Sequence, residues 1–241
     1  MTAQTALVLD DVTFAHEGLT LQFDLHVAAG EWLAIIGPSG AGKSTLLDIV
    51  AGFLQPDRGR VLFNGSDMTS AAPSDRPVSF VFQENNLFPN LTAEANVLLG
   101  LTTALRASPA EKQSALAALD AVGLAGFGKR LPAAMSGGER QRVALARAMV
   151  RKRPLLLLDE PLAALGPAMR QDILALMARL RREAGLTILM VTHQPDDAIG
   201  YADRIAYVEN GRIAAIGTTA EMLGPPPVSY THLRAHETRG N

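Results

Sequence analysis

Residues 37 to 45 read Gly37-Pro38-Ser39-Gly40-Ala41-Gly42-Lys43-Ser44-Thr45, which fits the pattern G-x-x-x-x-G-K-[ST]. The apolar residues 32–36 before this stretch predict a short buried strand, and residues 46–50 after it predict a helix. Strand, loop and helix in this order are the context in which the pattern binds phosphate. The glycines let the backbone curl so that several N–H groups converge on one anion, and the helix start adds its dipole. A glycine-rich turn that binds nothing is the alternative, and the flanking pattern makes it the weaker interpretation.

Polar side chains at two places in the sequence complete this anion site. We expect Lys43 to reach the β- and γ-phosphates of a nucleotide and the Ser44 hydroxyl to complete a Mg²⁺ shell. Asp159 and Glu160 follow the leucine run 155–158, which is typical of a strand buried on both faces of a parallel sheet. At the carboxyl end of such a strand Asp159 can hold Mg²⁺, and Glu160 can orient or deprotonate an attacking water. An Asp-Glu pair alone is a weak signal, but together with the loop it predicts a nucleotide-hydrolysis site.

A second helix start lies well downstream of this loop. Ser136 and Glu139 have the spacing of a capping box, so a helix is predicted to begin there and to run to Val150. Gly137 and Gly138 cost helix stability, which favours a place where something approaches the backbone closely. Since a helix start with bare N–H groups is an anion site, we interpret Ser136-Gly137-Gly138 as a second phosphate-binding segment. The alternative is that this segment only starts a helix.

The remaining pattern predicts an α/β fold. Residues 7–14 and 19–27 predict strands, and Asn64-Gly65 predicts a hairpin turn, so an antiparallel β lobe flanks the glycine-rich loop. Ala and Leu at helical spacing dominate residues 92–150, which predicts a helical insert. The other predicted elements are strands at 78–82, 187–192, 204–208 and 212–216, a turn at Asn210-Gly211 and a helix at 167–184.

Composition and charge exclude several classes of protein. The chain has 241 residues, of which 48% are hydrophobic, so one large α/β domain with a sizeable core is expected. The formal net charge of −2 argues against general nucleic-acid binding, and the lack of cysteine excludes disulfides, thiol nucleophiles and zinc–thiolate sites. The N-terminus lacks the layout of a signal peptide, and no apolar run approaches the ~20 residues of a membrane span. We therefore expect any role at a membrane to require a partner.

Residues 224–241 do not follow the pattern of the rest and are expected to form a disordered tail. The stretch 228–241 has no periodicity and resembles translated cloning or adapter sequence. We interpret that stretch as non-native and leave it out of the functional argument. An ordinary disordered native tail is the alternative.

Taken together, the motifs resemble those of ATP-binding cassette (ABC) transporter ATPases. They occur in the order found in that family: Gly37–Thr45, Gln83, Met135–Glu139, Leu155–Glu160 and His193. The Ser-Gly-Gly segment is nearly diagnostic, because ordinary P-loop enzymes lack it. The resemblance covers residues 7–223 and implies one ABC ATPase domain at 1–223. The implied fold is a RecA-like P-loop NTPase with a mixed sheet, the antiparallel β lobe and a helical subdomain inserted at about 88–150.

The resemblance also implies cofactors, residue roles and a second copy of the chain. ATP and Mg²⁺ are the implied cofactors. In the family two subunits sandwich two ATP molecules head to tail, which puts Ser136, Gly137 and Gly138 on the γ-phosphate held by the other subunit. His193 would hydrogen-bond the γ-phosphate, and Gln83 would contact the metal or water and relay to the transporter. The implied catalytic residues are Glu160, His193 and Gln83, and the implied metal ligands are Ser44, Gln83 and Asp159.

Three features depart from the family's usual pattern. Met135 stands where Leu or Val is usual and Glu139 where Gln is usual, and both keep the capping box intact. The aromatic residue that stacks on adenine corresponds to His16, whose imidazole can still stack, with Phe14 as the alternative. Gly166 stands where the family has an Asp that helps to tie the two ATP sites together, which puts the tightness of that coupling in question.

The resemblance implies a separate ATPase subunit that binds an integral membrane permease. This subunit would lie peripherally at the cytoplasmic face of the inner membrane and would serve a periplasmic or extracellular substrate-binding protein indirectly, with no nucleic-acid partner. The loops 51–54, 76–79 and 82–88 resemble those of ATPase subunits from bacterial thiamine importers. Thiamine or a related small cation is therefore the expected substrate, and an iron, polyamine or sulfate-like importer is the alternative.

Two other functional classes stay open at this point. The arginine-rich run from Arg140 to Arg153 fits a soluble ABC ATPase of DNA repair or translation, although such residues on a helix mostly form a solvated face. Gly166 fits a regulatory subunit that holds ATP without turnover, and Glu160 argues against it. The apolar loop residues Leu87 and Phe88 either dock the permease or fill the core of the helical insert.

Overall fold

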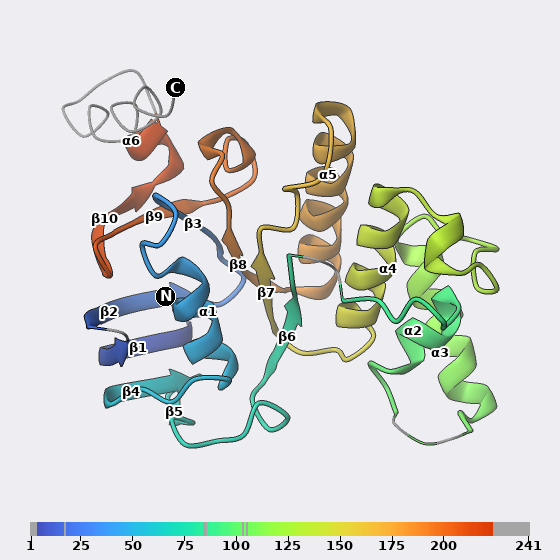
Figure 1. Cartoon of the computed structure of the whole chain (residues 1–241), viewed down its shortest axis with the longest axis horizontal. Helices are drawn as coiled ribbons and strands as arrows, with labels where there is room; N and C mark the ends of the chain where they lie inside the picture. Colours follow the sequence, from blue (N-terminus) through green and yellow to red (C-terminus); the bar gives the residue numbers. More distant parts are fainter. Residues whose placement is uncertain (1–3, 17, 84–85, 103, 105, 224–241) are drawn as a thin grey trace.

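One mixed sheet organises the computed structural model, which describes residues 4–16, 18–83, 86–102, 104 and 106–223. Within that part of the chain the strand order is β5-β4-β1-β2-β10-β9-β3-β8-β7-β6 (Figure 1). The antiparallel end holds β1 (Thr5–His16), β2 (Leu19–Ala28), β4 (Arg58–Phe63) and β5 (Ser66–Asp67). The parallel end holds β3 (Trp32–Ile36), β6 (Val78–Val81), β7 (Leu155–Asp159) and β8 (Thr187–Val191). Between them lie β9 (Arg204–Glu209) and β10 (Arg212–Thr218).

Two hairpin turns predicted from Asn-Gly pairs are confirmed. Asn64 and Gly65 join β4 to β5 with φ angles of 48° and 79°, and Asn210 and Gly211 join β9 to β10 with φ angles of 48° and 75°. Both residues of each pair lie in the left-handed region, which a two-residue turn needs in order to follow the twist of its strands. The first predicted strand is longer than expected, because β1 pairs with β2 from Thr5 to His16.

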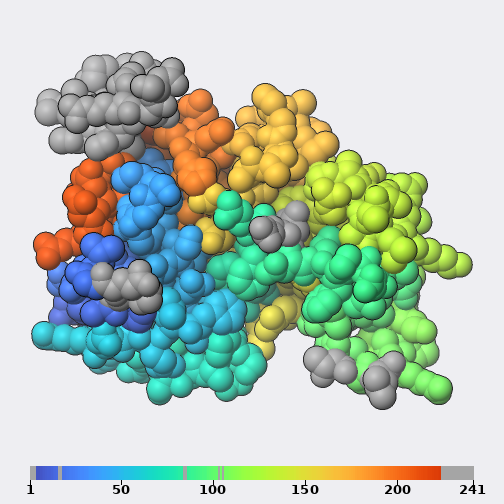
Figure 2. Space-filling model, in the orientation of Figure 1, coloured from blue at the N-terminus to red at the C-terminus, as the bar shows by residue number. Residues whose placement is uncertain are grey.

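Helices pack on the sheet and extend beyond its parallel end. Helix α1 (Lys43–Ala51) lies against the antiparallel lobe, and α5 (Pro167–Ala184) begins and ends at the predicted residues (Figure 1). The helical lobe, shown in green in Figure 2, contains α2 (Ala93–Leu98), α3 (Pro109–Ala121) and α4 (Gly137–Met149). The short helices are η1 (Pro132–Ala134), η2 (Pro195–Asp197) and α6 (Thr219–Leu223). Among the helices of the described residues, none is both long and apolar enough to cross a bilayer.

Side chains of β3 point alternately into two apolar cores. Leu33 and Ile35 join the core that contains α1 and the antiparallel strands, whereas Trp32, Ala34 and Ile36 join the core that contains residues of α4 and α5. All five side chains are at most 1% exposed, so the strand is buried on both faces, as a central parallel strand should be. This double burial holds rigid the strand from which the glycine-rich loop emerges.

A buried arginine holds the far end of α1. Arg76 has no exposed surface, and its guanidinium donates to the carbonyl oxygens of Ile49, Val50 and Thr69 at 2.6, 3.0 and 2.7 Å. Ile49 and Val50 belong to the last turn of α1, whose carbonyls carry the negative end of the helix dipole. Burial lowers the pKa of Arg76, but a guanidinium stays protonated in proteins. Arg76 therefore anchors the helix whose opposite end carries the predicted phosphate site.

Candidate functional site

The glycine-rich loop leads from β3 into the start of α1. Gly42 is the N-cap with a φ of 98°, and no side chain caps this helix, so its first N–H groups are left for a bound anion. A cavity of about 290 Å³ lies at this helix start. Its lining residues are Leu19, Leu21, Ser39, Gly40, Gly42, Lys43, Ser44, Thr45 and Glu160.

Gly37 is required by packing as well as by the shape of the loop. Its φ is 153°, and a Cβ at this position would lie 2.0 Å from the carbonyl oxygen of Val208 in β9. Such a contact is impossible with a backbone atom that is itself held in the sheet. The loop therefore starts where two strands approach too closely for any side chain.

Lys43 is folded back onto its own loop. Its side chain is buried, and Nζ donates to the carbonyl oxygens of Gly37 and Pro38 at 2.9 and 2.8 Å. Burial lowers the pKa of Lys43, while the charges of Glu160 and Asp159 act in the opposite direction. A desolvated ammonium whose two partners are neutral carbonyls is well suited to move onto a phosphate, because an anion compensates its charge better.

Ser44 and Asp159 bring two oxygen ligands together from α1 and β7. The Ser44 hydroxyl donates to Asp159 Oδ1 at 3.2 Å. Burial raises the pKa of Asp159, the hydrogen bond from Ser44 acts to lower it, and the charge of Glu160 raises it further. A hydroxyl beside a desolvated carboxylate suits Mg²⁺, which takes oxygen ligands and neutralises the charge. Among the described residues no group of three or more His, Asp or Glu forms a complete cage, so phosphate or water oxygens would supply the remaining ligands.

Glu160 and His193 meet at the carboxyl ends of β7 and β8. His193 Nε2 lies 2.5 Å from Glu160 Oε2, and the side chains are 51% and 12% exposed. Glu160 has a φ of 46°, in the left-handed region that glutamate seldom adopts. Backbone strain of this kind is common at active sites, and the strained Glu160 lines the cavity at the start of α1.

Gln83 and the Ser136 segment lie outside the lining of that cavity. Val81 of β6 pairs with Leu158 of β7, so Gln83 follows β6 at the same sheet edge as Glu160, with an exposed side chain. Ser136 begins α4 in the helical lobe, away from α1 (Figure 1). Within one copy of the chain, the two predicted phosphate-binding segments are therefore not brought together.

The predicted capping box at α4 is present. The Ser136 hydroxyl accepts from the Glu139 N–H at 3.2 Å, and Glu139 Oε2 accepts from the Ser136 N–H at 2.7 Å. This second bond is the main cause of a lowered pKa at Glu139, so the Glu139 carboxylate of the capping box stays ionised. A Cβ at Gly138 would lie 2.2 Å from Sδ of Met169 in α5. The close approach predicted for the glycine pair is thus made, in one copy of the chain, by a methionine side chain.

Comparison with known proteins decides the family. The model of the ABC transporter family matches residues 21–163, more than half of the chain. The chain belongs to the ABC transporter family. As in that family at large, its cassette is an ATP-hydrolysing subunit.

Curated relatives and solved structures agree with this assignment. The thiamine import ATP-binding protein ThiQ of Brucella suis biovar 1 (strain 1330) is 52% identical over 223 residues, which is 92% of each chain. The protein of the same name from Rhizobium meliloti (strain 1021) is 52% identical over 222 residues, 92% of this chain and 93% of the relative. An ATP-binding cassette of an ABC transporter in its ADP conformation has a TM-score of 0.86 at 25% identity, covering 95% of this chain and 98% of the other. A dimeric cassette bound to ADP and Pi has a TM-score of 0.76 at 30% identity, covering 88% and 98%.

For this ABC ATPase, the predicted adenine contact at His16 lies outside the described side chains. Phe14, the alternative, packs partly buried against the core of the antiparallel lobe. The structure instead places Leu19, 61% exposed, and Leu21 in the lining of the cavity. Sequence reasoning missed these two residues, because leucines in an alternating strand carry no signal that separates core packing from a ligand surface.

Proposed function

We propose that this ABC ATPase powers the import of thiamine or a related small cation through a separate membrane permease. The observation that carries the proposal is the juxtaposition of Lys43, Ser44, Asp159, Glu160 and His193 at one end of α1. The substrate follows from the relatives at about half identity, whose names all specify thiamine import. Importers of iron, of polyamines and of sulfate-like anions are the alternatives.

Each residue of the site has a role in hydrolysis that its geometry supports. Lys43 exchanges the carbonyls of Gly37 and Pro38 for the phosphates of ATP. Ser44 and Asp159 would hold Mg²⁺, which supplies positive charge to the phosphates when it is bound. Glu160 accepts a proton from the attacking water, and His193 moves from Glu160 to the γ-phosphate. Gln83, at the same sheet edge, reaches the metal or water when the helical lobe closes.

A second copy of the chain completes the site. Ser136, Gly137 and Gly138 lie outside the cavity of their own chain, and their N–H groups and hydroxyl suit the γ-phosphate held by a partner. A solved relative is a dimeric cassette bound to ADP and Pi. The head-to-tail arrangement puts each Ser136 segment over the partner's glycine-rich loop, as the family resemblance implies.

The permease docks in an aromatic groove beside the helical lobe. The groove has a volume of about 590 Å³, and Phe53, Phe80 and Phe82 meet in it with ring centroids 4.3 to 5.9 Å apart. Phe88 is 55% exposed at its rim, whereas Leu87 packs against the apolar core. Leu87 therefore both packs on the core and lines the groove, whereas Phe88 is the more exposed of the two and is available to a partner.

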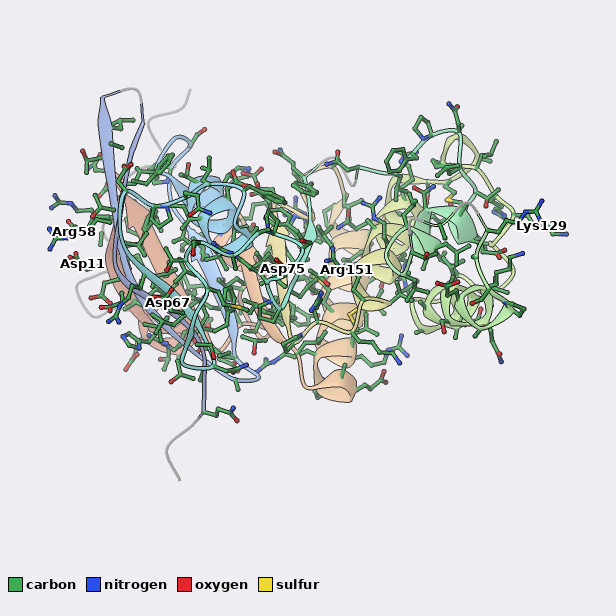
Figure 3. All side chains as sticks on the ribbon, turned by 90° about the horizontal axis from the view of Figure 1, so that it is seen from below. Asp11, Arg58, Asp67, Asp75, Lys129 and Arg151 are labelled. Carbon is green, nitrogen blue, oxygen red and sulfur yellow. The ribbon has the colours of Figure 1, made fainter. Side chains whose placement is uncertain are left out.

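The position of the groove allows ATP binding to change the surface that contacts the permease. Figure 2 shows the surface hollowed between the β lobe and the helical lobe, and Figure 3 places Arg151, one of the lining residues, between Asp67 of the β lobe and Lys129 of the helical lobe. Phe82 lies in the groove and directly precedes Gln83. Movement of Gln83 toward ATP would therefore shift one wall of the groove.

The arginine-rich run does not favour a nucleic-acid partner. Four of its arginines each donate one hydrogen bond to a carbonyl oxygen of the same chain, which orients part of each guanidinium inward: Arg140 to Met135, Arg142 to Val122, Arg147 to Asn86 and Arg153 to Ser74. A phosphate-binding surface would present those donors outward. We accordingly place the subunit at the cytoplasmic face of the inner membrane, held there by the permease, with a substrate-binding protein as indirect partner.

Two measurements test the proposal. Glu160→Gln should lower ATP hydrolysis on the order of 10²–10⁴-fold, as expected for a lost general base, while ATP binding persists and the chain accumulates as a dimer in gel filtration. Near-normal turnover would remove Glu160 from the mechanism. With the permease and binding protein in proteoliposomes, thiamine should stimulate the ATPase, and stimulation by iron, a polyamine or sulfate instead would reassign the substrate.

Phe88→Ala tests the docking surface. The variant should keep its melting temperature and basal ATPase but lose permease binding and uptake, because Phe88 already faces solvent in the isolated chain. Leu131→Ala is the matched control, since Leu131 is 44% exposed and lies outside the lining of the groove. Unchanged uptake in a stable Phe88→Ala variant excludes docking at this residue.

A further inference from the structure

The guanidinium of Arg170, in the first turn of α5, holds the loop that follows Glu160. It donates to the carbonyl oxygens of Leu162 and Leu165 at 3.1 and 3.4 Å. These carbonyls lie between the end of β7 and the start of α5, where Gly166 replaces the family's usual Asp. Arg170 therefore fixes the backbone of a loop whose first residue is the proposed base.

The same guanidinium holds the segment that follows β8. Nη1 lies 3.1 and 3.2 Å from the two carboxylate oxygens of Asp197 and also donates to the side chain of Gln194. The side chains of Arg170 and Asp197 are 13% and 4% exposed, so this ion pair is shielded from water. A shielded, hydrogen-bonded pair keeps its geometry far better than a surface pair does.

Asp197 in turn closes the backbone around His193. Its Oδ2 accepts from the Thr192 hydroxyl at 2.7 Å, and that hydroxyl accepts from the Gln194 N–H at 3.1 Å. Thr192 and Gln194 are the immediate neighbours of His193, so these two bonds fix the turn that presents its imidazole. His193 Nε2 then reaches Glu160 Oε2 at 2.5 Å.

We propose that Arg170 is a positioning residue for ATP hydrolysis. It ties the loop after Glu160 to the turn at His193, and so it fixes the two backbone segments from which the carboxylate and the imidazole act. The proposal rests on the proposed function of Glu160 and His193. A planar fork of five donors can bind two carbonyls and a carboxylate in different directions at once, whereas the compact ammonium of lysine cannot.

Three single variants, each measured on the full-length chain, isolate this role. Arg170→Lys keeps the buried charge but loses the fork, and Asp197→Asn keeps the shape but loses the charge. Arg182→Ala is the matched control, because Arg182 is an exposed arginine in the last turn of the same helix. We expect Arg170→Lys and Asp197→Asn to lower kcat ~10–100-fold, as for a slightly misplaced catalytic group, with the Kd for ATP within about twofold of wild type. Arg182→Ala should leave both constants unchanged.

The route through His193 is tested on a second background. If Arg170 acts by placing His193, Arg170→Lys adds no further loss of kcat to a His193→Ala chain, because the group that it places is already gone. Likewise, the double variant of Arg170→Lys and Asp197→Asn should be no worse than the poorer single variant. Losses that multiply in either pair overturn the coupling between the loop after Glu160 and the turn at His193 that the proposal assigns to Arg170.

Thermal melting separates positioning from mere stability. A fall in kcat at full folded fraction supports the proposal, and a fall that only follows the folded fraction overturns it. If Arg170→Lys melts below the assay temperature, Asp197→Asn alone decides by the same criterion. A fully active Glu160→Gln chain would mean that the proposed site itself is wrong, whereas an inactive Glu160→Gln chain with fully active Arg170→Lys and Asp197→Asn chains would leave the site intact and remove Arg170 from it.

Discussion

The starts of α1 and α4 are both glycine-containing helix N-termini, yet their capping differs. At α1 the N-cap is Gly42, no side chain caps the helix, and the buried Lys43 waits on two loop carbonyls. At α4 the Ser136 and Glu139 side chains satisfy each other's N–H groups. The first N–H groups of α1 face a cavity, whereas the capping box of α4 occupies the N–H groups of Ser136 and Glu139 and leaves those of Gly137 and Gly138 unused.

This difference separates binding from completion. We expect the open start of α1 to take the phosphates of ATP directly, because no side chain of the described residues caps its first N–H groups. The start of α4 is held by its own capping box, with Met169 packed against Gly138, and we expect its Gly137 and Gly138 N–H groups to meet a nucleotide only in a dimer. This difference between the two helix starts fits an order of events in which ATP binds one subunit first and dimerisation follows.

The largest expected effect comes from separating the two helix starts onto different copies. Lys43→Ala and Ser136→Arg chains should each lose nearly all hydrolysis, because each homodimer lacks one half of both sites. A mixed dimer contains one intact composite site, so part of the activity, or at least one trapped nucleotide, should return on mixing. ATPase assays and nucleotide-trapping measurements on the mixture check this. If neither returns, α4 does not act on the partner's ATP.

Gly138 offers a way to split packing from ligand binding at the start of α4. Gly138→Ala should lower the free energy of unfolding by ~1 kcal/mol, the low end for an overpacked site, because Met169 is a flexible, partly exposed side chain. Adding Met169→Ala to the Gly138→Ala chain should restore the stability. It should not restore hydrolysis if the backbone at position 138 also meets a phosphate, because the new Cβ would still crowd that phosphate. Gly137→Ala is the control for the stability measurement only, since its Cβ would lie 3.6 Å from Leu165, an ordinary contact. Denaturant melts and ATPase rates measure the two effects separately, and full recovery of both would leave Gly138 a packing residue only.

At the open start, Asp159→Asn should stabilise the chain in the absence of nucleotide. Burial raises the pKa of Asp159 above its ordinary value, so the folded state disfavours the ionised form. The resulting loss of stability sets in as the pH rises from the ordinary Asp pKa of about 4 through the raised folded value, and it is complete above that. At neutral pH we expect the Tm of Asp159→Asn to exceed that of wild type by about 2–4 °C per kcal/mol gained, with the gap closing toward acid pH. Adding ATP and Mg²⁺ should reverse the order. Equal or lower Tm at neutral pH without nucleotide contradicts this account.

Gly166 gives the smallest effect. It is the N-cap of α5 with a φ of −70°, and a Cβ there would meet no atom within 4 Å, so glycine is not required by strain or crowding. Gly166→Asp should add a few tenths of a kcal/mol by capping α5, measured by denaturant melts. It should also strengthen ATP-driven dimerisation or the cooperativity of hydrolysis. Complete loss of activity would show that the dimer requires a residue without a side chain at position 166.

Much of the site could be read from local pattern alone. The glycine-rich loop, the capping box at Ser136, the two Asn-Gly turns and the bounds of α5 all depend on short-range geometry, so a few neighbouring residues suffice to predict them. The full burial of β3 and the placement of Asp159 at a strand end follow from continuous apolar runs in the sequence. The roles of Gln83 and His193 were drawn from motif order instead, and they stay predictions.

Other features had no local signal. The motif predicts Gly37 but not the approach of Val208 from a distant strand, and the burial of Arg76 depends on its bonds to the last carbonyls of α1. Arg170 looks like any other charged residue of an amphipathic helix until the loops after β7 and β8 fold onto it. No pattern within a window of the sequence distinguishes such residues from solvent-exposed ones.

The sequence by itself determined the motifs, their order and the elements that carry them, because dihedral preferences, caps and periodicity are properties of short segments. Only the tertiary structure decided that Lys43 rests on its own loop, that Met169 covers Gly138 and that Arg170 joins the loop after Glu160 to the turn at His193. The contacts of Met169 with Gly138 and of Arg170 with Asp197 join residues far apart in the chain, and their distances are set by how the sheet and its helices pack. Local pattern thus predicts the site residues, and tertiary packing determines which other residues hold them in place.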